Sequence, residues 1–215
     1  MSVLRIFIAT ILMVLLPSLG LAQQVMVSAA ASLTNAFKEL GPTFEAAHPG
    51  VTLRFNFAAS GTLLQQIEQG APVDVFASAD QITVTRGIEK GVFEADSKRD
   101  FARNTVVLVI PAQDAQGMPT SLASLSQTQW KRIAVGKVAT VPVGRYTKEA
   151  LDQAGLWESL TPKFVYADTV RQALDYVSRG EADAGFVYRT DAALIADKVK
   201  IAFTVQGHTP ETKHT

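Results

Sequence analysis

Four predicted helix starts carry uncharged hydrogen-bond donors directly after a predicted strand. Ser32 and Ser60 open two of these helices, and residues 142–144 and 168–170 open the other two. A helix N-terminus presents unpaired backbone N–H groups and a partial positive charge, so it attracts anions. In open α/β sheets such starts gather beyond the carboxyl ends of the strands. The pattern therefore predicts an anion site lined by neutral groups.

A single start of this kind is weak evidence, because serine, threonine and aspartate commonly act as ordinary N-caps. Small side chains fill 29-AAAS-32 and 58-AASGT-62, so backbone amides there can approach an ion closely. Val143 and Val170 can offer a ligand only their backbone N–H groups. Micromolar binding needs about 8 kcal/mol, and each hydrogen bond to a charged group contributes roughly 1.5–3 kcal/mol. Because desolvating the ion is costly, about seven donors from four or five segments must converge.

Charged residues near these starts leave other interpretations open. Arg145 and Arg171 each lie just inside a helix start, where bidentate contacts would suit phosphate or sulfate. Asp168 is expected to cap its own helix by accepting from the N–H of residue 170 or 171. Asp74 and Asp80 are expected to form turns, because no histidine or third carboxylate lies nearby to complete a metal site.

Composition excludes several classes of function. The 215 residues include no cysteine and only three histidines (His48, His208 and His214), so disulfides, thiolate metal centres and a histidine-rich metal site are not expected. Lys+Arg and Asp+Glu both number 20, which leaves no basic field for nucleic acid. An enzyme is the rival class, but the sequence has no Gly-x-Ser-x-Gly elbow with a plausible base and no glycine-rich nucleotide motif.

The first 22 residues have the pattern of a secretory signal peptide. Arg5 supplies a positive charge, residues 6–16 form an apolar run, and small residues precede position 23. The apolar run is too short to span a bilayer with ordinary flanks. We expect cleavage after Ala22 and export without membrane insertion of the mature chain; the alternative is an uncleaved membrane anchor.

Apolar periodicity alternates between strand and helix along the rest of the chain, which predicts an α/β fold with mostly parallel sheets. Strands are expected at residues 25–27, 51–57, 73–77, 105–110, 133–135, 164–166, 184–188 and 200–204, and helices at 33–44, 63–67, 144–154 and 169–178. The run 105–110 has the β-branched composition of a strand buried in a parallel sheet. Gly41-Pro42 is expected to kink or split the first helix.

Two lobes are expected from this pattern. The loop-rich stretch 91–104 is the natural seam, so residues 23–103 are assigned to a first α/β lobe and residues 104–215 to a second. Residues 207–215 are polar, and no terminal helix or strand is expected among them.

Four motifs in the same order resemble the periplasmic molybdate-binding proteins of ABC-type importers, which are type II periplasmic binding proteins. The motifs are 29-AAASLTNAF-37, 57-FAASGTLLQQIEQGAPVDVFASAD-80, 141-VPVGRYTKEAL-151 and 184-AGFVYRTDA-192. The resemblance implies a two-lobed fold that closes on a tetrahedral oxyanion, molybdate and also tungstate, with no other cofactor. It further implies a periplasmic, monomeric receptor that delivers the ion to a membrane permease. Sulfate or phosphate is the alternative ligand.

The resemblance also implies which residues hold the ion. Ser32 and Ser60 match the serines that donate hydroxyls, Val143 and Val170 match positions that use backbone amides, and Tyr188 matches the tyrosine donor. Because those donors are neutral, Arg145 and Arg171 are expected to face solvent or to form ion pairs at the rim.

Two departures from the family pattern stand out. Relatives typically carry Ser-Ser-Ser-Thr where this chain has 59-ASGT-62. Relatives also continue with a second hinge strand and terminal helices packed on the first lobe. We therefore expect those C-terminal elements, including the return segment to the first lobe, to be missing.

Overall fold

The computed structural model describes residues 23–113, 117–205 and 212–214. The predicted signal peptide, residues 1–22, lies outside the described residues. Among the residues that are described, no helix has the length and apolar character needed to cross a bilayer.

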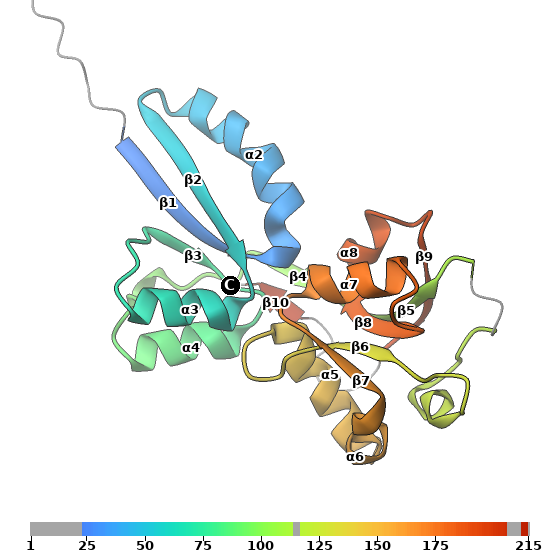
Figure 1. The fold of residues 1–215 in the computed structure, drawn as a ribbon. Coiled ribbons are helices and arrows are strands. Elements are labelled where there is room, and N and C mark those ends of the chain that lie inside the picture. Colours follow the sequence, from blue (N-terminus) through green and yellow to red (C-terminus); the bar gives the residue numbers. More distant parts are fainter. Residues whose placement is uncertain (1–22, 114–116, 206–211, 215) are drawn as a thin grey trace, which may run out of the picture.

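The N-terminal unit (residues 23–89) is built on a parallel three-stranded sheet (Figure 1). Its strands, in the order β2-β1-β3, are β1 (Gln23–Ala30), β2 (Val51–Ala58) and β3 (Val75–Ala77), and its helices are α2 (Thr34–Ala47), α3 (Ser60–Glu68) and α4 (Gln81–Glu89). A short 3-10 turn, η1 (Ala31–Leu33), joins β1 to α2. Helix α2 continues through Pro42, so the helix is not split there, and the alternative of a kink stays a prediction.

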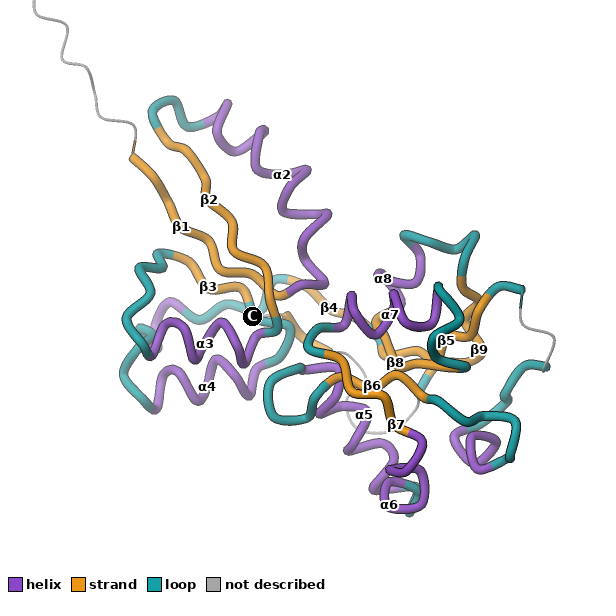
Figure 2. The backbone as a smooth tube through the Cα atoms, in the orientation of Figure 1, coloured by secondary structure: helices purple, strands orange, loops and turns teal. Residues whose placement is uncertain are grey.

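The C-terminal unit (residues 106–205) contains a five-stranded sheet in the order β7-β6-β8-β5-β9 (Figure 2). The strands are β5 (Val106–Pro111), β6 (Ile133–Gly136), β7 (Phe164–Ala167), β8 (Ala184–Tyr188) and β9 (Val199–Thr204), and the helices are α5 (Pro142–Gln153), α6 (Trp157–Leu160), α7 (Val170–Ser178) and α8 (Arg189–Ala193). Short 3-10 turns lie at Ala95–Ser97, Leu122–Ser126 and Thr161–Lys163.

Helix α7 shows how the sequence pattern builds this unit. Val170, Ala173, Leu174 and Val177 are buried at the i, i+3, i+4, i+7 spacing of one helix face. That face packs on β6 and β8, whose residues are buried along their whole lengths. This packing places the start of α7 at the edge of the sheet where β7 and β8 have their carboxyl ends.

Strand β5 differs from the prediction that residues 105–110 form a strand of a parallel sheet. It is buried as predicted, but it runs antiparallel to both β8 and β9. Val106, its first residue, pairs with Tyr188, the last residue of β8, because the chain enters the sheet at the end where β8 finishes. Burial on both faces produces the same apolar run in either direction, so composition could not reveal the direction.

The C-terminal tail also differs from the expectation. Thr212–His214 form a short strand, β10, that pairs antiparallel with β4 (Ala102–Asn104). The prediction that residues 207–215 contain no strand is therefore wrong for residues 212–214. The backbone N–H and C=O groups of β10 gain hydrogen-bond partners from β4. The polar sequence of the tail does not indicate this pairing.

Gly144 should be required where α5 packs against the end of β6. A Cβ atom at Gly144 would lie 2.0 Å from the carbonyl oxygen of Gly136. We predict that Gly144→Ala lowers the free energy of unfolding by about 1–3 kcal/mol through overpacking, measured by urea denaturation. Glu149→Ala, at an exposed position of the same helix, is the control and should change stability by less than about 0.5 kcal/mol. Equal effects of the two substitutions would contradict the tight helix–strand contact.

Candidate functional site

The five residues predicted to bind the ion line one small cavity between the two units. Ser32, Ser60, Val143, Val170 and Tyr188 surround it together with alanines and other apolar residues, and its volume is about 10 Å³. That volume accommodates roughly one water-sized group. An ion of a few atoms can enter only if the units move slightly apart and close again around it.

The N-terminal unit contributes two serines from the ends of β1 and β2. Ser60 is the first residue of α3 and is fully buried, and its Oγ accepts a hydrogen bond of 2.9 Å from the Ala79 N–H. Because this contact occupies the oxygen as an acceptor, the hydroxyl hydrogen can be donated to a ligand. Ser32 lies in η1, between β1 and α2. Both serines are thus carried by turns that follow strands of one sheet.

The C-terminal unit contributes two helix starts. Val143 is the second residue of α5 and Val170 is the first residue of α7, and both side chains are buried. The first four N–H groups of a helix have no acceptor within that helix. Both amides are therefore placed to donate to a group at the helix N-termini, where the helix dipoles also favour negative charge.

Tyr188 completes the lining at the end of β8. Its side chain is 1% exposed, and burial raises the pKa of its hydroxyl well above the usual value. The group therefore stays protonated at every physiological pH. A protonated phenol can donate a hydrogen bond to an anion, whereas a phenolate would repel one.

The two arginines form ion pairs, which is one of the two predicted outcomes, but their partners are buried. The Nη2 of Arg145 lies 2.5 Å from the Oδ2 of Asp80, and the Nε of Arg171 lies 2.6 Å from the Oδ1 of Asp191. Both aspartates are fully buried, so these are interior ion pairs rather than solvent-facing or rim contacts. The aspartates offset the positive charge of each arginine, and the cavity keeps a lining without net charge. No local pattern indicates these partners, which lie 65 and 20 positions away along the chain.

Asp168 does not cap α7 as predicted, whereas Asp80 does have a structural role. Thr169, not Asp168, caps α7 by accepting from the Gln172 N–H at 3.1 Å. Asp168 instead forms an exposed ion pair with Lys137. Asp80 caps α4 by accepting from the Thr83 N–H at 3.2 Å, which agrees with the predicted structural role. No cluster of His, Cys, Asp or Glu suited to a metal ion occurs in the part of the chain that the structure describes.

Comparison with known proteins identifies the family. Residues 25–210 match the family model of bacterial extracellular solute-binding proteins. The chain belongs to this family. The molybdate-binding protein ModA of Escherichia coli is 39% identical over 198 residues, covering 89% of this chain and 73% of that protein. ModA of Haemophilus influenzae is 32% identical over 200 residues, covering 90% and 77%.

A solved structure gives the same result for the fold. The periplasmic molybdate-binding protein of Azotobacter vinelandii superposes with a TM-score of 0.69 at 25% identity, over 88% of this chain and 83% of that one. The predicted type II binding-protein fold is thus confirmed. The chain spans 66%, 73% and 77% of the lengths of three curated relatives. The family consists of solute-binding proteins rather than enzymes.

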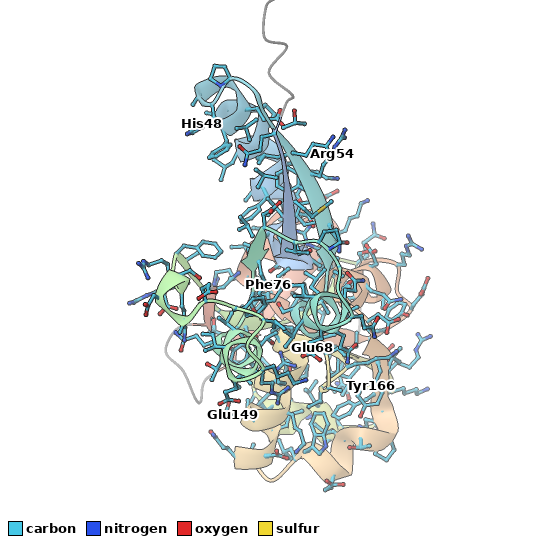
Figure 3. The ribbon with its side chains drawn as sticks, turned by 90° about the vertical axis from the view of Figure 1, so that its left-hand side faces the viewer. His48, Arg54, Glu68, Phe76, Glu149 and Tyr166 are labelled. Carbon is cyan, nitrogen blue, oxygen red and sulfur yellow. The ribbon has the colours of Figure 1, made fainter. Side chains whose placement is uncertain are left out.

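The position of His48 agrees with a binding protein rather than a hydrolase. His48 ends α2, and Figure 3 shows it at the tip of the N-terminal unit, remote from the strand ends that carry Ser60. Its Nδ1 lies 2.9 Å from the Phe44 carbonyl oxygen. A base for a serine nucleophile must lie within hydrogen-bond reach of it. His48 cannot fill that role in this arrangement.

Burial of Asp191 should give the protein a distinctive pH dependence. Desolvation raises the pKa of this carboxyl to about 6, although Arg171 lowers it in part. The folded state therefore keeps the proton to a higher pH than the unfolded chain does. As the pH rises from 3.8 to about 6, the unfolded chain loses this proton while the folded protein keeps it, and the difference lowers the free energy of unfolding. Above about 6 both states are ionised and no further stability is lost.

We predict that the wild-type stability, relative to Asp191→Asn, falls by roughly 2–2.5 kcal/mol between pH 4 and pH 7. Urea denaturation of both proteins at several pH values measures this difference. Asparagine cannot ionise, so the pH-dependent part of the comparison belongs to Asp191. A difference that stays constant with pH would show that Asp191 titrates as it does in the unfolded chain.

Proposed function

We propose that this protein is the solute-binding component of a molybdate importer of the ABC type. The convergence of Ser32, Ser60, Val143, Val170 and Tyr188 on one small cavity carries this proposal. We assign the two serine hydroxyls, the valine amides and the tyrosine hydroxyl as donors to the oxygens of the ion. The relatives named for molybdate binding, at 32% and 39% identity, support the choice of ligand.

We propose that residues 23–103 and 104–215 act as two lobes that close on the ion. Donors come from both sides of the cavity, so the bound ion contacts both lobes only when they are closed. Such differential contacts shift the population from open to closed. Closure also excludes water, which strengthens each hydrogen bond to the ion.

Selectivity should follow from the chemistry of this lining. Tungstate, with the same tetrahedral arrangement of four oxygens, should also bind. A protonated phosphate brings a hydrogen that an all-donor lining cannot accept. Sulfate is the second candidate ligand, because it too is a tetrahedral dianion, and the size of the closed cavity must discriminate against it.

The remaining assignments concern the cellular setting. We propose that the chain is exported to the periplasm after cleavage behind Ala22, acts as a monomer and delivers its ion to a membrane permease. The signal-peptide pattern of residues 1–22 and the extracellular solute-binding family support export.

Molybdate should stabilise the exported chain against heat. At a concentration of about 100 Kd the ligand adds about 2.7 kcal/mol, which raises the Tm of a chain of this size by about 5–10 °C. A thermal-shift series with molybdate, tungstate, sulfate and phosphate measures this effect. We expect large shifts with the first two ions and small shifts with the others. Equal shifts with sulfate and molybdate would refute discrimination by cavity size.

Ser60→Ala should weaken molybdate binding by roughly 1.5–3 kcal/mol, because the hydroxyl donates a charge-assisted bond to the ion. Isothermal titration calorimetry measures the change in Kd. Ser28→Ala is the matched control: Ser28 is also a buried serine, but it does not line the cavity. That variant should bind as the wild type does. Unchanged affinity in Ser60→Ala, with reduced stability, would make Ser60 a structural residue only.

A further inference from the structure

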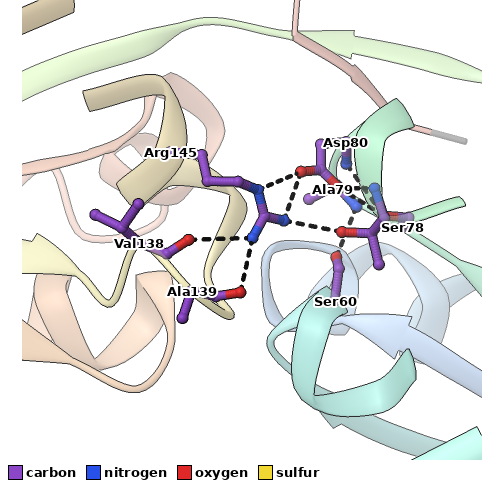
Figure 4. A network of polar contacts seen from close by, with 8 residues as sticks. Ser60, Ser78, Ala79, Asp80, Val138, Ala139 and Arg145 are labelled. Atoms are coloured by element: carbon purple, nitrogen blue, oxygen red, sulfur yellow. Dashed lines mark hydrogen bonds and ion pairs between the residues drawn. The ribbon is translucent and has the colours of Figure 1, made fainter. Parts of the chain in front are cut away.

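An ion pair joins the two units directly beside the cavity. Arg145, in the first turn of α5, reaches across to Asp80 at the start of α4 (Figure 4). Its Nε and Nη2 lie 2.9 Å and 2.5 Å from the Oδ2 of Asp80. The two residues belong to different units, so this contact exists only when the units are close together.

The pair is shielded from water and its polar atoms are well satisfied. The Asp80 side chain is 1% exposed and that of Arg145 is 11% exposed. Arg145 also donates to Thr83 Oγ1 at 2.8 Å and to the carbonyl oxygens of Val138 and Ala139 at 3.3 Å each. A guanidinium with this many partners is held in one orientation.

A backbone hydrogen bond beside the ion pair also joins the two units. The Gly61 N–H donates to the Thr140 carbonyl oxygen at 2.9 Å. A Cβ atom at Gly61 would lie 2.7 Å from that oxygen, so a residue with a side chain would hold the loop away. The glycine that replaces a serine of the family pattern thus permits this close approach.

We propose that Asp80 and Arg145 form a latch that holds the units closed whether or not an anion is bound. The latch also positions the site. Asp80 follows Ala79, whose N–H orients the Ser60 hydroxyl, and Arg145 lies two residues after Val143. Opening the units to admit an ion breaks the latch, and closing them restores it together with the donors on both sides.

The latch has two measurable consequences. The ligand-free protein populates the closed arrangement, because the ion pair favours it without help from an anion. The second consequence rests on the proposed function: bound molybdate dissociates slowly, because release must break the latch as well as the contacts to the ion.

The decisive variant is the double substitution Asp80→Asn/Arg145→Gln. Removing one partner alone would leave a buried unpaired charge and destabilise the fold, whereas the double variant leaves none. Asparagine is also a good N-cap, so the start of α4 is preserved. Lys148→Gln is the control, because it removes an exposed ion pair with Asp152 on the same helix.

The distance between the units, measured without anion, tests the latch. The sequence has no cysteine, so Gln69→Cys and Glu149→Cys, at exposed positions of the two units, can carry a pair of spin labels. We expect a population at the short distance in the labelled wild type and in Lys148→Gln, and a loss of that population to longer distances in the double variant. The same distance distribution in all three proteins would overturn the proposal.

The dissociation rate of molybdate, from stopped-flow fluorescence, tests the positioning role. We expect release to be about tenfold faster in the double variant and unchanged in Lys148→Gln. Equal rates in all proteins would show that the pair does not act on the site. If the wild type fails to bind molybdate, the proposed function fails, and the anion-free distances still decide whether the latch exists.

Discussion

The site depends on one constraint: the carboxyl ends of strands from two separate sheets must face each other. Each end delivers a helix start or a turn, and the first N–H groups of a helix have no partner within that helix. One such end attracts an anion weakly, since its dipole contributes only about 0.3–1 kcal/mol. The arrangement brings Ser60, Val143, Val170 and Tyr188 to the same cavity. We propose that these groups together replace the water around a small dianion.

Charged side chains lie near the cavity, but each arginine there is neutralised by a paired aspartate. Arg145 and Arg171 sit at the first turns of α5 and α7, where an uncompensated charge would bind many anions alike. Buried aspartates offset both arginines. Burial of such pairs is costly, as the raised pKa of Asp191 shows. In return, the arginines hold the two units in position, because Arg145 contacts Asp80 and Arg171 contacts Asn35 of the N-terminal unit.

Small residues make the close approach of the units possible. Alanines line the cavity between Ser32 and Ser60, and Gly61 allows a backbone hydrogen bond to Thr140 across the gap. Larger side chains would separate the donors from one another. A glycine suits position 61 because a Cβ atom there would lie 2.7 Å from the Thr140 carbonyl oxygen of the neighbouring unit.

The sequence by itself determined the α/β class, most strand and helix positions and five of the residues that line the cavity. It could do so because periodicity, small-residue runs and family motifs are local signals. Tertiary structure decided the direction of β5, the pairing of β10 with β4, and the partners of Arg145 and Arg171. A buried strand has the same apolar run in either direction. An ion pair between residues 80 and 145 leaves no periodic trace, since it forms only when two separately folded units meet.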